Sequence, residues 1–135
     1  MKHTAELTVR SYECDSYNHV NNSVYLNYLE FGRMEFLHAI NFDYKGIVAA
    51  GYYLYVTHID IYYKGSAFLD DVLEVSTESS KLGKVSGEFK QVIKKKDPIK
   101  GHIEIIIRVK SLFVYSRTVY FYCIYFSQYP RALLQ

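Results

Sequence analysis

The chain has 135 residues, enough for one ordinary domain that buries about two-thirds of its unfolded surface. Half of the residues are hydrophobic and 22% are charged, which is typical of a globular protein and excludes a disordered one. The formal net charge of +2 is too small to indicate nucleic acid or an anionic membrane as the main partner.

Cysteine usage and the first residues indicate the compartment. Cys14 and Cys123 do not have the spacing of a metal site, and we expect both to be reduced thiols. The first ten residues contain no apolar core of signal-peptide length. We therefore expect a cytoplasmic protein without an export signal.

The first predicted element is a strand from Glu6 to Cys14. Leu7 and Val9 alternate there with polar side chains, which is the period of a half-buried strand. Asp15 to Asn18 is rich in turn-forming residue types and predicts a turn.

A long amphipathic helix is predicted next, from about Asn22 to Ile40. Apolar or small residues recur there at steps of three and four, which is helical spacing: Tyr25, Leu29, Gly32, Phe36 and Ile40, with Tyr28 widening the stripe. Asn21 or Asn22 is the expected N-cap. Because glycine is unfavourable inside a helix, Gly32 predicts a close approach between this helix and a sheet. Residues 41 to 51 form a connection with room for one helical turn.

The rest of the chain is strand-like. The predicted strands are Tyr52–Tyr63, Val72–Ser79, Val85–Ile93, His102–Tyr115 and Val119–Phe126. The short links between them favour antiparallel hairpins. The apolar stretch Leu112–Phe126 is too short for a membrane span and is interrupted by Arg117, so a strand pair is favoured.

One helix against one largely antiparallel sheet makes a single α+β domain over residues 1–135. Such a single layer leaves much of its surface uncovered, and pairing with a second copy is the usual solution. The 15 tyrosines also fit an interface. We therefore expect a homodimer or homotetramer.

The densest polar cluster, Asp15 to Asn22, lies between the first strand and the start of the helix. The first turn of a helix has unsatisfied N–H groups, which can polarise a thioester carbonyl. A carboxylate just upstream can attack that carbonyl or deprotonate a water. The structural alternative is that these residues only satisfy turns and the helix cap.

The run DSYNHVNNSVYLNYLEFGRMEF, from Asp15 to Phe36, resembles the opening signature of the hotdog-fold acyl-CoA thioesterases. The 4-hydroxybenzoyl-CoA thioesterase-like branch is the nearest, and the part from Asn18 to Tyr25 also resembles acyl-ACP thioesterases. A looser similarity continues through Tyr62–Asp71. After Lys96 the chain departs from the family pattern, because its last third is unusually rich in tyrosine and phenylalanine.

The resemblance implies a hotdog fold, in which a long central helix packs on a curved, mostly antiparallel sheet of five or six strands. It makes Asp15 the catalytic carboxylate and places Asn22 at the helix N-terminus, where its amide polarises the thioester carbonyl. His19 is a second catalytic candidate, and Tyr25 is expected to contact substrate.

Two further groups of polar residues are candidates for binding. Lys81 and Lys84 lie at predicted strand ends and can meet the phosphates of coenzyme A, although a solvated hairpin is the simpler explanation. His58 and Asp60 share one strand face but have no third ligand in motif spacing, so no metal site is expected. Glu30 and Arg33 have the spacing of a helix-surface ion pair.

The resemblance therefore implies an acyl thioesterase that hydrolyses acyl-CoA or acyl-ACP without a cofactor. One alternative is a hotdog enoyl-CoA hydratase, which the Asn18–Asn22 run disfavours. Another is a non-catalytic protein that binds acyl groups or serves in assembly, which is favoured if the atypical last third of the chain has damaged the pocket.

Overall fold

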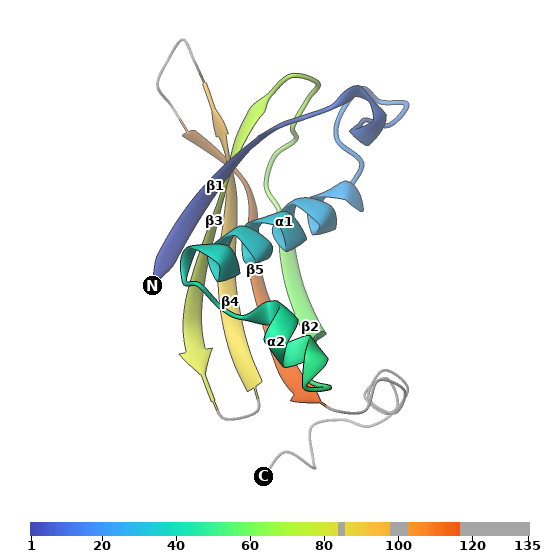
Figure 1. Ribbon diagram of the computed structural model, residues 1–135. Helices are drawn as coiled ribbons and strands as arrows, with labels where there is room; N and C mark the ends of the chain where they lie inside the picture. The colour runs from blue at the N-terminus through green and yellow to red at the C-terminus, as the bar shows by residue number, and fades with distance from the viewer. Residues whose placement is uncertain (84–85, 98–102, 117–135) are drawn as a thin grey trace.

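The computed structural model describes residues 1–83, 86–97 and 103–116. Its elements in chain order are β1 (Lys2–Thr8), one turn of 3-10 helix η1 (Ser11–Glu13), α1 (Val24–Ala39), α2 (Tyr44–Ala49), β2 (Tyr53–Tyr63), β3 (Val72–Leu82), β4 (Ser86–Lys96) and β5 (Ile103–Ser116). The strands form one antiparallel sheet in the order β1-β3-β4-β5-β2, and α1 lies across one face of it (Figure 1). The predicted pairing of one long helix with one antiparallel sheet is confirmed.

The predicted bounds of the first strand were wrong. The alternation of Leu7 and Val9 does mark a strand, but β1 starts at Lys2 and ends at Thr8. Its partner β3 begins only at Val72, and Val9 makes the last contact with that segment by donating its N–H to the carbonyl of Asp71 at 3.0 Å. Beyond this point β3 offers no further residues for pairing, and the chain turns into η1 instead of continuing as a strand to Cys14.

The predicted long helix is confirmed as α1, with its start shifted. The helix begins at Val24 with Ser23 as its N-cap, so the expectation of Asn21 or Asn22 as N-cap was wrong. Asn21 instead stabilises the turn before the helix, because its side-chain oxygen accepts hydrogen bonds from the N–H and the hydroxyl of Ser23 at 3.0 and 2.9 Å. The predicted pair of Glu30 and Arg33 also forms.

Gly32 lies where α1 comes closest to the sheet. A Cβ at this position would overlap Cγ1 of Val75 and would lie 3.1 Å from Oγ1 of Thr77. The expectation that this glycine permits close packing is therefore confirmed. Below it, Gln91 is fully buried and donates hydrogen bonds of 2.9 Å to Oγ1 of Thr77 and to the carbonyl of Leu29, so the helix and the sheet are also joined by polar contacts.

Two apolar clusters lie between α1 and the sheet. The first surrounds the N-terminal half of α1 and is made of Val9, Val20, Tyr25, Tyr28, Leu29, Ala67, Leu73, Val75 and Ile93. The second lies under the C-terminal half of the helix and contains Phe36, Leu37 and Phe89. Burial of these side chains is what holds the helix on the sheet.

The later strands agree with the prediction within the described residues. A bulge between Val56 and His58 shifts the register of β2 against β5. After it, Ile59 and Ile61 pack against the first apolar cluster, whereas His58 and Asp60 are exposed. The predicted strand 119–126 lies outside the described residues. No helix in the described ranges is long and apolar enough to span a membrane.

Candidate active site

Asp15 opens the turn between η1 and α1, as predicted. Its N–H donates to the carbonyl of His19 at 2.9 Å, and its own carbonyl accepts from the N–H of Asn18 at 3.0 Å. Asn18 has a φ of 64°, a left-handed conformation that asparagine tolerates better than most residues. These two main-chain hydrogen bonds and the left-handed conformation of Asn18 fix the position of the Asp15 main chain.

The turn is held against the segment that follows β2. The N–H of Val20 donates to the carbonyl of Ala67 at 2.8 Å, and His19 forms an isolated antiparallel bridge with Phe68. On its other side, the N–H of Asn21 donates to the carbonyl of Glu13 at 3.0 Å. The candidate catalytic residues therefore lie in a loop that is hydrogen-bonded on both sides.

The Asp15 carboxylate is partly accessible, with its side chain 21% exposed. Its Oδ1 accepts a 2.8 Å hydrogen bond from the N–H of Tyr17, and its Oδ2 lies 3.6 Å from Nδ1 of His19. His19 is also partly exposed, and its Nδ1 lies 3.1 Å from the carbonyl oxygen of Val20. The structure thus brings Asp15 and His19 together, with one carboxylate oxygen fixed by the turn.

Asn22 lies at the start of α1, with an exposed side chain. Its carbonyl accepts a 3.0 Å hydrogen bond from the hydroxyl of Tyr63, which ties this peptide to the end of β2. The N–H groups of the next two residues, Ser23 and Val24, donate to Asn21. For the N–H of Asn22, the described part of the chain offers no acceptor. Such an unsatisfied amide just before a helix, near the positive end of its dipole, is a suitable donor to an anionic oxygen.

Tyr25 lies behind this loop, in the apolar core. Only 3% of the residue is exposed, and its hydroxyl accepts a 2.9 Å hydrogen bond from the N–H of Ala67. Burial raises the pKa of this hydroxyl above its usual value. Tyr25 therefore supports the segment on which Val20 is anchored, and its contact with substrate stays a prediction.

Of the two lysines predicted to bind coenzyme A, the structure describes Lys81, which is not near Asp15 in one chain. Lys81 is exposed near the end of β3, and Lys84 lies outside the described residues. Asp15 follows β1 at the other end of the sheet, where β3 begins at Val72 (Figure 1). At about 3.3 Å per strand residue, Val72 and Lys81 are roughly 30 Å apart.

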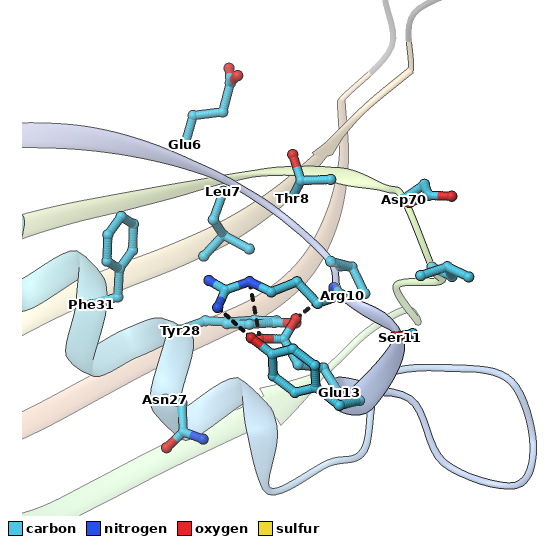
Figure 2. Close-up of a pocket in the computed structure, with 13 residues that line it drawn as sticks. Glu6, Leu7, Thr8, Arg10, Ser11, Glu13, Asn27, Tyr28, Phe31 and Asp70 are labelled. Atoms are coloured by element: carbon cyan, nitrogen blue, oxygen red, sulfur yellow. Dashed lines mark hydrogen bonds and ion pairs between the residues drawn. The ribbon is translucent and has the colours of Figure 1, made fainter.

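Glu13 and Tyr28 form a buried polar pair beside this loop that was not predicted from sequence (Figure 2). The Tyr28 hydroxyl donates a 2.7 Å hydrogen bond to Oε2 of Glu13, and the N–H of Arg10 donates to the same oxygen at 2.8 Å. Glu13 is only 9% exposed and Tyr28 only 3%. Burial, and after it the Glu13 carboxylate, raise the pKa of the Tyr28 hydroxyl, which keeps it protonated. Glu13 shares the alternation of Leu7 and Val9 within the predicted strand, but β1 ends at Thr8, so this pattern does not account for its burial.

Two cavities flank α1. One, of about 930 Å³, lies between β1, η1 and α1, and Glu13 and Tyr28 point into it (Figure 2). The other, of about 350 Å³, lies under the C-terminal half of α1 and is lined mainly by apolar side chains, among them Met34, Leu37 and Phe89. A volume of this size is within the range of small-molecule sites.

His58 and Asp60 pair with each other, with 2.9 Å between Nε2 and Oδ1, and both are about half exposed. Among the residues that the structure describes, no group of three or more His, Cys, Asp or Glu side chains is arranged to hold a metal ion.

Comparison with known proteins identifies the family. The profile of the thioesterase-like superfamily matches residues 9–118. The long-chain acyl-CoA thioesterase FadM of Escherichia coli strain K12 is 36% identical over 88 residues, which are 65% of this chain and 66% of that protein. The chloroplastic acyl-acyl carrier protein thioesterase ATL3 of Arabidopsis thaliana is 40% identical over 57 residues, 42% of this chain and 30% of that protein. The matched regions span less than two-thirds of these curated relatives.

Similarity to solved structures supports the same assignment of the fold. The probable thioesterase YbaW from Escherichia coli is 30% identical with a TM-score of 0.70, covering 83% of this chain and 80% of that one. The 4-hydroxybenzoyl CoA thioesterase from Pseudomonas sp. strain CBS-3 is only 15% identical, with a TM-score of 0.79 over 90% of this chain and 88% of that one, and shows the fold alone. The chain belongs to the thioesterase-like superfamily and has the hotdog fold, with one main helix and an antiparallel sheet, that its motif from Asp15 to Phe36 predicts.

Proposed function

We propose that this protein hydrolyses acyl thioesters of coenzyme A or acyl carrier protein, with Asp15 as the catalytic carboxylate. One observation carries the proposal. A partly exposed carboxylate lies in the turn before α1, and the amide of Asn22 at the start of the same helix has no acceptor in the described part of the chain. A thioester hydrolase needs both a group that attacks or activates water and a donor for the carbonyl oxygen.

In the proposed reaction the thioester oxygen accepts a hydrogen bond from the Asn22 amide. The Asp15 carboxylate then acts in one of two ways. As a nucleophile it forms an acyl anhydride and expels the thiolate, which takes up a proton, and water then cleaves the anhydride. As a general base it takes a proton from water while the resulting hydroxide attacks the carbonyl, after which the C–S bond breaks and the leaving thiolate takes up the proton held by Asp15. Both routes give a free acid and a thiol and require no cofactor.

The substrate class follows from the relatives. The names of FadM and ATL3 specify acyl-CoA and acyl-acyl carrier protein thioesters respectively. We propose the same two carriers for this chain. Tyr25, Lys81 and Lys84 remain our candidates for substrate contacts. Since Lys81 lies at the far end of the sheet from Asp15, we place the two lysines at the active site of another subunit.

We further propose that the active protein is a homodimer or homotetramer. β2 is an 11-residue edge strand, and the described residues provide a partner, β5, on one side of it only. A long unpaired edge is a template for another strand, and a second copy would cover it. Light scattering should return at least twice the 15.8 kDa of one chain. A monomer at micromolar concentration would contradict this part of the proposal.

A thiol-release assay across a panel of acyl-CoA and acyl-ACP substrates tests the activity. Release of free thiol is the result that we expect. Addition of water to an enoyl-CoA without thiol release would favour a hydratase instead. Binding without turnover would favour the non-catalytic acyl-binding alternative.

A further inference from the structure

Glu13 is a buried carboxylate two residues before Asp15, and its oxygens are engaged by groups from two elements. Oε2 accepts hydrogen bonds from the Tyr28 hydroxyl at 2.7 Å and from the N–H of Arg10 at 2.8 Å. Oε1 lies 3.9 Å from Nε of Arg10. Burial of an ionised carboxylate is unfavourable unless donors of this kind compensate it. The surrounding groups are thus arranged to hold this side chain in one place.

The main chain of Glu13 is connected to the start of α1 as well. Its carbonyl accepts a 3.0 Å hydrogen bond from the N–H of Asn21. The oxygens of Asn21 in turn accept from the N–H groups of Ser23 and Val24. Tyr28 lies on α1, about one turn after its first residue. Glu13 is therefore attached to the helix through its side chain at Tyr28 and to the turn just before the helix through its main chain at Asn21.

Two tyrosines of α1 hold the two sides of the catalytic loop. Tyr28 binds Glu13 before Asp15, and Tyr25 binds Ala67, whose carbonyl accepts from the N–H of Val20 after Asp15. A phenylalanine would fill the core equally well at position 28, so the hydroxyl of Tyr28 is not needed for apolar burial. Its contribution is the fixed position of Glu13.

We propose that Glu13 is a positioning residue that sets the place of the Asp15 carboxylate relative to the Asn22 amide, with the Tyr28 hydroxyl as its anchor on α1. This inference rests on the proposed thioesterase function. Glu13 acts through the loop and does not touch the reacting atoms. A displacement of about 1 Å in a catalytic group can lower a rate by up to about 100-fold, so loss of this anchor should be visible in turnover.

The test combines amide hydrogen exchange with steady-state kinetics on the full-length protein. In Tyr28→Phe, peptides covering residues 13–23 should exchange at least about tenfold faster, whereas peptides from β3 and β4 should keep the wild-type rate. The kcat for thiol release should fall by about 3- to 100-fold, with a change in KM of less than about twofold. Glu13→Ala should behave likewise, and adding Tyr28→Phe to it should cause no further loss.

Conservative replacement and a matched control separate positioning from other roles. Glu13→Gln keeps an oxygen that accepts from Tyr28, so it should retain most of the turnover that Glu13→Ala loses. Thr4→Val removes a different hydroxyl, which is 2.9 Å from Oγ of Ser76 at the other end of β1, and should leave kcat within about twofold of wild type.

Three outcomes would overturn the inference. One is a wild-type rate of amide exchange in the loop of Tyr28→Phe. The second is faster exchange throughout the sheet of that variant, which indicates a general loss of stability. The third is a loss of turnover in Glu13→Gln as large as that in Asp15→Asn. A wild-type protein that releases no thiol from any substrate would instead contradict the proposed function. The exchange pattern would then still decide whether Glu13 and Tyr28 hold the loop.

Discussion

Nδ1 of His19 lies 3.6 Å from Oδ2 of Asp15 but only 3.1 Å from the carbonyl oxygen of Val20. A carbonyl oxygen can only accept, so a hydrogen bond between Nδ1 and the Val20 oxygen requires a proton on Nδ1. The nitrogen that faces Asp15 is therefore a donor, which suits orientation of the carboxylate and not removal of a proton from water at that atom. On this geometry we propose Asp15 as the principal catalytic group and His19 as an auxiliary one.

We expect His19→Ala to lower kcat by less than about tenfold, a smaller loss than the roughly 100-fold or more typical of a missing general base. The main-chain hydrogen bond from Asp15 to residue 19 persists when the side chain is removed. The measurement is thiol release, with His38→Ala as the control, since His38 is an exposed histidine that pairs with Glu35 at the far end of α1. A loss as large as that in Asp15→Asn would mean that His19 carries the reaction.

The helix and the catalytic turn were predictable because each depends on local sequence. The stripe through Leu29 and Phe36 fixes the face of α1, and Asp15–Asn18 has the composition of a turn. The end of β1 was not predictable, because it depends on where a partner strand begins, at Val72, which is 64 positions after Thr8. Glu13 was not predictable either, because its burial and its partner on α1 are defined only by the folded structure.

Substitution of Lys81 tests whether the nucleotide end of the substrate binds at the ends of the strands. Lys81→Ala and Lys84→Ala should each raise KM for acyl-CoA and leave kcat nearly unchanged, because the phosphates are remote from the reacting carbon. Lys90→Ala, which removes an exposed lysine from the middle of β4, is the matched control. An unchanged KM in both single variants and in the double variant would place the nucleotide elsewhere.

The close contact at Gly32 predicts that alanine will destabilise the fold. Alanine would favour the helix by roughly 1 kcal/mol, but overpacking of a filled core typically costs about 1–3 kcal/mol. Because Val75 is fully buried and has little room to move, we expect a net loss of about 1 kcal/mol in the free energy of unfolding. Urea unfolding measures this, with the helix-surface variant Glu35→Ala as the control. Equal or greater stability of Gly32→Ala would contradict the close packing.

The raised pKa of Tyr28 predicts how stability changes with pH. The unfolded chain loses a tyrosine proton near pH 10, whereas burial and the Glu13 carboxylate keep this proton on the folded protein at higher pH. The contribution of the Tyr28 hydroxyl is therefore fully present below about pH 10 and declines as the pH rises above it. The difference in unfolding free energy between wild type and Tyr28→Phe should be constant from about pH 7 to 9 and should shrink beyond about pH 10. If urea titrations showed a constant difference up to about pH 11, the assigned shift would be wrong.

The most direct test of the account is kcat for thiol release by Asp15→Asn, measured together with its thermal melt. Asparagine keeps the shape of the side chain, and its oxygen can still accept from the N–H of Tyr17, so the turn should fold. Without the negative charge, neither nucleophilic attack nor general-base activation of water remains, and kcat should fall by at least about 100-fold with little change in KM. A variant that melts like the wild type and retains more than about a tenth of its turnover would contradict the assignment of Asp15 as the catalytic carboxylate.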